Sequence, residues 1–102
     1  MIEPPSLRDA IGSYLFVEHN LDDEFAANLA SGRGRFDEQL RRGLARVLAT
    51  GAMDFDDFTE ITGDFEDEDD EIIERLQHIW ETAFPGVDVR EYLGSSGATA
   101  AE

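Results

Sequence analysis

The sequence predicts an all-α fold, with four to five short helices in a compact, bundle-like single domain over residues 1–93. Apolar residues recur at three- and four-residue spacing in several segments, whereas no segment shows the alternation of apolar and polar residues that marks a strand. Glycines and capping acids separate these segments. With 102 residues, of which 41% are hydrophobic, the chain fills one modest core and not two. Residues 94–102 are small and polar, which predicts a disordered C-terminal tail.

Two helices are predicted in the first part of the chain. Ser6 and Asp9 have the spacing of a capping box, and apolar residues follow at helical intervals, so we expect a helix over residues 7–18. Acidic residues then open a shorter segment, residues 22–29, where negative charge favours the first turn of a second helix. Gly32 lies just beyond this segment and is expected to end it.

The third helix is the clearest predicted element, because one apolar stripe runs along it. Gly51 follows the stripe and should end the helix. Gly43 lies beside the stripe, where glycine costs about 1 kcal/mol relative to alanine, so we expect a close helix approach there. The stripe consists of Phe36, Leu40, Leu44, Val47 and Leu48.

Two more helices are predicted in the acidic half of the chain. Asp54 should cap a short helix that Gly63 ends. A longer helix is expected from about Asp67 to Ala83, with a wide apolar face that includes Trp80. Residues 87–93 are predicted to form a short terminal segment that docks on the core through its apolar side chains.

The net charge is −16 and is distributed unevenly along the chain. Up to Met53 there are eight acidic residues and six arginines, whereas from Asp54 onward there are sixteen acidic residues and two arginines. Such a surface repels phosphate backbones and anionic lipids, so neither nucleic acid nor a membrane is an expected partner. A basic protein is the expected partner.

The composition also excludes several kinds of site and location. Without cysteine there is no disulfide, no thiolate metal site and no cysteine nucleophile. No apolar run approaches the roughly 18 to 20 residues of a membrane span, and the first residues lack the pattern of a signal peptide, so we expect a cytoplasmic protein. All eight basic residues are arginine, a bias that suggests a GC-rich bacterial or phage gene.

The outstanding feature is a run from Asp54 to Glu74 that contains twelve acidic residues and no basic one. Three or four carboxylates are enough to stabilise helix N-termini, and the others repel one another within the Debye length of about 8 Å. We interpret the excess as a partner-binding surface with Phe65 as an apolar anchor, and simple solubility is the alternative. The predicted partner-binding residues are Asp56, Asp57, Glu60, Asp64, Phe65, Glu66, Asp67, Glu68, Asp69, Asp70, Glu71 and Glu74.

Four arginines cluster on and before the third helix. We expect them to pair within the domain, either with Asp37 and Glu38 or with the acidic run, and a nucleic-acid role is not favoured at this net charge. The four are Arg35, Arg41, Arg42 and Arg46.

No catalytic residue, metal site or cofactor is predicted, so we do not expect an enzyme. His19 and His78 are far apart and neither has the spacing of a triad or metal pair. A calcium-binding loop that started at Asp64 would need glycine and glutamate where Asp69 and Arg75 stand.

The first helical segment, Leu7-Arg8-Asp9-Ala10-Ile11-Gly12-Ser13-Tyr14-Leu15, resembles the opening of the small immunity proteins of bacterial contact-dependent growth inhibition and related polymorphic toxin systems. The segment Phe84-Pro85-Gly86-Val87-Asp88-Val89-Arg90-Glu91-Tyr92-Leu93 is similar to their closing segment, whereas Glu18-His19-Asn20 differs from the Gln-Asp-Trp of their first turn. The resemblance implies a cytoplasmic helical protein that neutralises one cognate toxin domain, often a basic nuclease, by covering its active site.

Three functions therefore remain open at this point. The first is an immunity protein that neutralises a basic, nuclease-like toxin domain. The second is a phage-type inhibitor or DNA mimic, whose carboxylates imitate phosphates and occupy a nucleic-acid-binding enzyme. The third is an acidic adaptor that has no cationic partner.

Overall fold

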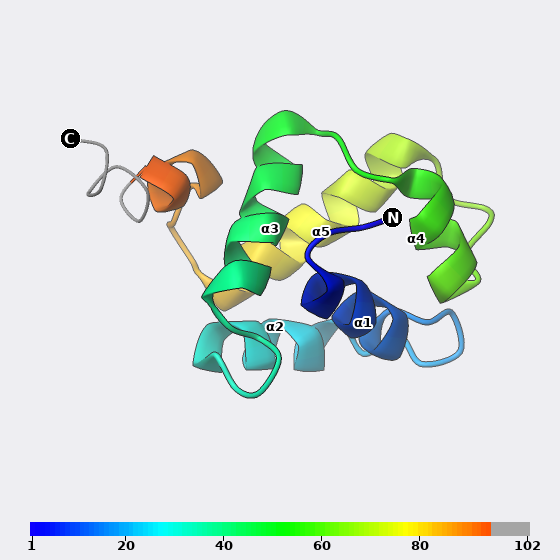
Figure 1. The fold of residues 1–102 in the computed structure, drawn as a ribbon, viewed down its shortest axis with the longest axis horizontal. Coiled ribbons are helices and arrows are strands. Elements are labelled where there is room, and N and C mark those ends of the chain that lie inside the picture. Colours follow the sequence, from blue (N-terminus) through cyan, green and yellow to red (C-terminus); the bar gives the residue numbers. More distant parts are fainter. Residues whose placement is uncertain (95–102) are drawn as a thin grey trace.

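The computed structural model describes residues 1–94, which form six helical segments and no strand. The labelled helices are α1 (Pro5–Tyr14), α2 (Asp22–Ser31), α3 (Glu38–Thr50), α4 (Phe55–Thr62) and α5 (Asp69–Ala83) (Figure 1). A sixth helical segment covers residues 89–94. The all-α prediction is confirmed, and the predicted count of four to five helices is corrected to six.

The extra helix arises because the terminal segment has a cap as well as apolar side chains. The carboxylate of Asp88 accepts a hydrogen bond from the backbone N–H of Arg90 at 2.7 Å. The backbone carbonyl of Asp88 accepts one from the backbone N–H of Tyr92 at 2.9 Å. Val89 is buried, as expected for a segment that docks on the core. Gly94, the first residue of the predicted tail, still belongs to this helix, and the rest of that tail, residues 95–102, lies outside the described residues.

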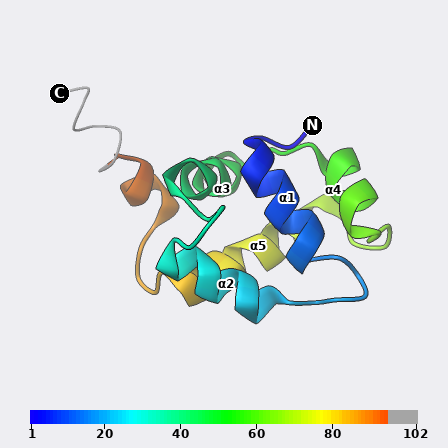
Figure 2. The same cartoon turned by 60° about the horizontal axis from the view of Figure 1, so that its bottom comes forward.

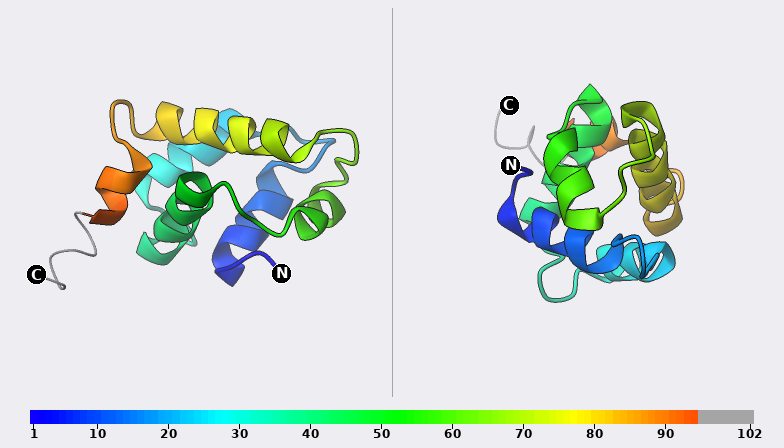
Figure 3. Two further views of the ribbon diagram at one scale, coloured as in Figure 1. Left: turned by 90° about the horizontal axis from the view of Figure 1, so that it is seen from above. Right: turned by 90° about the vertical axis from the view of Figure 1, so that its right-hand side faces the viewer.

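The helices cross one another around the core. α2 and α5 lie side by side and make the most extensive contact between two helices, while α1 packs against both α3 and α4 (Figure 2). α3 crosses α5 steeply, as Figures 1 and 3 show, so the helices do not all run alongside one another as in an up-and-down bundle. In residues 1–94 no helix combines the length and the apolar character that crossing a bilayer requires.

The buried apolar side chains form one cluster, to which every helix contributes. Trp80 is fully buried, as predicted, and so is Phe58; the indole Nε1 of Trp80 donates a hydrogen bond to the carbonyl of Val87 at 2.8 Å. The rings of Tyr14, Phe25 and Phe36 meet edge to face with centroids 5.3 to 5.9 Å apart. These contacts join α1, α2 and the segment before α3.

The boundaries of α1 differ from the prediction at both ends. The helix begins at Pro5 with Pro4 as its N-cap, and it has no side-chain cap, so the predicted capping box does not form. Pro5 occupies the first helical position, which suits proline because a backbone N–H there would have no partner within the helix. At the other end the backbone turns after Tyr14, whose carbonyl accepts a hydrogen bond from the N–H of Leu21 at 2.8 Å, and Glu18 therefore lies outside the helix.

The predicted glycine stops are confirmed. Gly51 and Gly63 end α3 and α4 in the left-handed conformation, at φ 70° and 75°. Asp54 caps α4 as predicted, with its carboxylate 3.0 Å from the N–H of Asp57. α5 begins at Asp69, two residues later than expected, because the preceding residues form a separate turn.

A close approach at Gly43 is also confirmed, although the residue that approaches is Pro4, the N-cap of α1, and not a residue within a helix. A methyl group at this position would overlap the ring of Pro4, which leads into α1. The N-terminal segment therefore lies against α3 where α3 lacks a side chain.

Alanine at Gly43 should destabilise the protein, although alanine normally stabilises a helix interior by about 1 kcal/mol relative to glycine. Gly12→Ala is the matched control, because its methyl group would meet Ile61 at an ordinary contact distance of 3.7 Å. We expect urea unfolding to show a loss of stability for Gly43→Ala and a gain for Gly12→Ala. A gain for both variants would contradict the close packing of Pro4 on α3.

Candidate functional site

Some acidic residues of the run form ion pairs and hydrogen bonds within the protein, whereas the others are exposed. Asp54 pairs with the amino group of Met1 at 2.6 Å while it caps α4. Asp57 accepts two hydrogen bonds from the guanidinium of Arg8, at 2.8 and 3.1 Å, and one from the N–H of Ile2 at 2.9 Å. These two carboxylates fasten the N-terminal segment to α4.

Asp57 was predicted to bind a partner, but its side chain is only 11% exposed and its oxygens are engaged within the protein. The hydrogen bond from Arg8 lowers the pKa of Asp57, against the opposing effect of burial. This residue contributes to the fold and does not belong to the exposed acidic surface.

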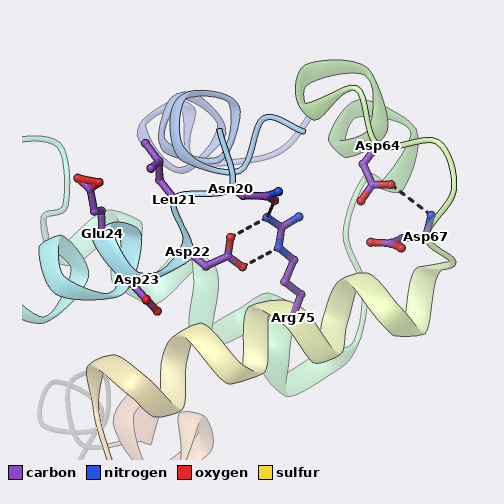
Figure 4. Close-up of a pocket in the computed structure, with 8 residues that line it drawn as sticks. All are labelled: Asn20, Leu21, Asp22, Asp23, Glu24, Asp64, Asp67 and Arg75. Atoms are coloured by element: carbon purple, nitrogen blue, oxygen red, sulfur yellow. Dashed lines mark hydrogen bonds and ion pairs between the residues drawn. The ribbon is translucent and has the colours of Figure 1, made fainter. Parts of the chain in front are cut away.

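A polar pocket of about 520 Å³ brings two parts of the acidic sequence together (Figure 4). One wall is the turn before α2 and its first residues, and the other is the turn that joins α4 to α5. The lining residues are Asn20, Leu21, Asp22, Asp23, Glu24, Asp64, Asp67 and Arg75. The acids of α2 were expected only to favour a helix N-terminus, so their place in this pocket was missed.

Arg75 occupies the centre of this pocket. Its Nε and Nη2 each lie 2.7 Å from an oxygen of Asp22, and Nη2 also donates to the side-chain oxygen of Asn20 at 3.2 Å (Figure 4). A two-pronged contact of this kind is specific to the planar guanidinium group. Arg75 therefore ties α5 to the start of α2, and its charge is already matched by a carboxylate of the same chain.

Asp64 and Asp67 lie beside Arg75 in the turn before α5. The carboxylate of Asp64 accepts hydrogen bonds from the N–H groups of Glu66 and Asp67, each at 3.3 Å. A hydrogen bond with Asp64, together with burial, raises the pKa of Asp67. Burial pushes the pKa of Asp64 upward, but the hydrogen bonds from Asp67 and the backbone lower it overall. The contacts between these two residues therefore shift their pKa values in opposite directions, with that of Asp67 the higher.

The remaining acids of the run are exposed. Among residues 1–94 none of them forms an ion pair, because the three ion pairs found there involve Asp54, Asp57 and Asp22. Phe65 accompanies them with 73% of its surface exposed. The exposed acids are Asp56, Glu60, Glu66, Glu68, Asp69, Asp70, Glu71 and Glu74, which we call the outer acids.

The expected ion pairs of the arginine cluster are not found for Arg35, Arg41 and Arg46, because the three ion pairs within residues 1–94 involve none of them. Arg41 binds backbone carbonyls instead. Its Nε and Nη2 donate to the carbonyl of Leu29 at 3.0 and 2.8 Å, and Nη2 also reaches the carbonyl of Ala30 at 3.0 Å. The guanidinium lies 5.3 Å from the ring centre of Phe84. Because the last carbonyls of a helix lack partners in their own helix, Arg41 closes the C-terminus of α2.

The outer acids give their surface the capacity to bind cations. Carboxylates accept hydrogen bonds from guanidinium and ammonium groups, and such contacts are the stronger charge-assisted kind. In the described part of the chain no three histidine or acidic side chains are grouped so as to hold a metal ion. The surface therefore offers charge, hydrogen-bond acceptors and one exposed ring.

Acid should weaken the protein partly through Asp57. Because its pKa in the folded protein lies below the ordinary value of 3.8, its contribution is present above that value and is lost as the pH falls through the folded pKa. We expect Asp57→Asn to be less stable than the wild type near neutral pH and to lose less stability from about pH 5 to about pH 2. Urea unfolding at each pH measures this, with the exposed neighbour substitution Asp56→Asn as control. Parallel pH curves for Asp57→Asn and the wild type would refute the assignment.

Comparison of this chain with models of protein families, with curated protein sequences and with solved structures gives no match. The function is therefore inferred from the geometry and charge of the site.

Proposed function

We propose that this chain is a cytoplasmic bacterial inhibitor that binds a basic protein without catalysing a reaction, and that it serves as an immunity protein against a nuclease-like toxin domain. The observation that carries the proposal is the set of outer acids, which form no ion pair within residues 1–94 and include acids close to the exposed Phe65 in the sequence. The resemblance of the two terminal segments to immunity proteins supports the same function.

The number of outer acids exceeds what the helices need. The first turn of α5 already holds Asp69, Asp70 and Glu71, which favour the positive end of the helix dipole. Glu66 precedes this turn and Glu74 follows it, so both add repulsion with little benefit to the helix. A cationic surface that docks here would remove that repulsion and would also be attracted from a distance.

Phe65 supplies the apolar component of the proposed interface. A ring that is 73% exposed contributes little to the core, whereas burial on binding would be worth about 1.5 to 3 kcal/mol. Apolar groups that lie within a charged rim are typical of tight interfaces. Nuclease domains carry basic surfaces that contact phosphates, and an acidic face of this kind would cover such a surface.

The proposal is tested by capturing the partner from the native host with immobilised protein at low salt. The face variant carries Glu66→Gln, Glu68→Gln, Asp69→Asn and Asp70→Asn, and the control variant carries Asp9→Asn, Glu18→Gln, Glu81→Gln and Glu91→Gln. Both lose four exposed charges. We expect the wild type and the control to retain the same basic protein and the face variant to lose it. Equal retention by all three would exclude the acidic face as the binding site.

Phe65→Ala should lower the affinity for the captured protein by about ten-fold or more, because the ring would no longer be buried on binding. Its unfolding midpoint should match that of the wild type, since the ring is largely exposed. An unchanged affinity would remove Phe65 from the interface. Inhibition of nuclease activity by the wild type would identify the immunity function, whereas release of a different captured enzyme by duplex DNA would favour a DNA mimic.

A further inference from the structure

A second depression, of about 460 Å³, lies where the end of α3, the start of α4 and the first turns of α5 meet. It is lined by Gly51, Phe55, Asp69, Asp70, Ile73 and Glu74, and we call it the α4–α5 groove. Phe55 and Ile73 are half-buried and pack against the core, so each still presents apolar surface. The three acids are exposed.

The spacing of residues on α5 produces this combination. Asp69 and Ile73 are four positions apart, as are Asp70 and Glu74, and Asp70 and Ile73 are three apart, so these residues lie on one side of the helix. The buried face of the same helix is formed by other residues, among them Ile72 and Leu76. Ile73 is thus an apolar residue on the edge of the acidic face.

The α4–α5 groove differs from the pocket in Figure 4 in its charge balance. That pocket contains Arg75, which is held by Asp22. No basic residue lines the α4–α5 groove, and none of its three acids forms an ion pair within residues 1–94. Within the described chain, no apolar side chain therefore fills the groove above Phe55 and Ile73, and no cation pairs with its three acids.

We propose that the α4–α5 groove receives a basic, amphipathic helical segment of the partner protein, with a large aliphatic side chain over Phe55 and Ile73. Lysine or arginine residues that flank this side chain pair with Asp69, Asp70 and Glu74. The proposal rests on the proposed binding of a basic protein and specifies which feature of that protein is recognised. Charge complementarity selects the occupant, because an acidic or neutral apolar segment would leave the rim unpaired. The helix-in-groove mode fits an apolar contact with charged residues on either side.

Two synthetic peptides test this proposal with the full-length protein. One contains lysine and leucine in the order of an amphipathic helix, and the other has serine in place of every leucine, so that both carry the same charge. We expect the wild type to bind the lysine and leucine peptide at least about ten-fold more tightly, because only this peptide buries aliphatic surface. Fluorescence anisotropy of the labelled peptides gives both affinities.

Variants then locate the binding site. Ile73→Ser should remove most of the preference for leucine, whereas Val87→Ser, at an apolar residue that is 39% exposed elsewhere, should keep it. Because Ile73 is half-buried, the folded state of this variant is verified by circular dichroism. A second variant, with Asp69→Asn, Asp70→Asn and Glu74→Gln, changes only exposed side chains and should weaken both peptides.

Equal affinity of the wild type for the two peptides, or a leucine preference that Ile73→Ser and Val87→Ser reduce equally, would overturn the assignment of the groove. Either result can occur while the face variant still loses the captured host protein, in which case the acidic face binds by charge alone. If neither the wild type nor any variant captured a basic host protein, the proposed function itself would be rejected. The two sets of experiments thus separate the two proposals.

Discussion

Positive charge is scarce in this protein, and its few cations determine how distant segments are joined. Twenty-four acidic residues share eight arginines and one amino terminus, so most carboxylates have no counter-charge of their own in the chain. The fold uses its few cations at junctions between distant segments. Arg8 and the amino group of Met1 hold the N-terminal segment on α4, and Arg75 holds α5 on the start of α2. Arg41 closes the C-terminus of α2 through backbone carbonyls.

The core allows the acidic residues to remain outside. α5 buries one face, including Leu76 and Trp80, against the other helices, and this apolar contact offsets the repulsion among the acids on its other faces. α2 lies along α5 and brings its own acidic first turn next to the turn before α5. One end of the α2–α5 pair therefore concentrates negative charge that the sequence distributes over two separate segments.

The local part of the fold could be predicted from the sequence. Helical spacing, capping acids and glycine stops located α2 to α5 closely, because these signals act within a few residues. α1 was misplaced because Ser6 and Asp9 mimic a cap that Pro4 and Pro5 replace. The last helix was missed because a single capped turn after a Pro-Gly pair has too few residues for a periodic signal.

The site was less accessible to sequence reasoning, because its contacts join residues that are far apart in the chain. The bond between Arg75 and Asp22 spans 53 positions, and that between Arg8 and Asp57 spans 49. Nothing in the local spacing distinguishes Asp57, which is engaged, from Asp56, which is exposed. Arg41 binds backbone carbonyls, which have no signature in the side-chain sequence. The exposed Phe65, by contrast, was suggested by its place between a helix-ending glycine and the acids.

The outer acids are expected to repel one another in the free protein, and we propose that a cationic partner removes this repulsion. This repulsion is measured by the free energy of unfolding in urea at about 0.05 and about 0.5 M NaCl, for the wild type and a double variant with Glu66→Gln and Glu74→Gln, which keeps the acids of the first turn of α5. Salt weakens the internal ion pairs in both proteins alike, so the difference between them reports the outer acids. The double variant should be the more stable protein at low salt, and the wild type should gain more from added salt. Equal stability at low salt and an identical response to salt would show that the outer acids do not destabilise the free protein.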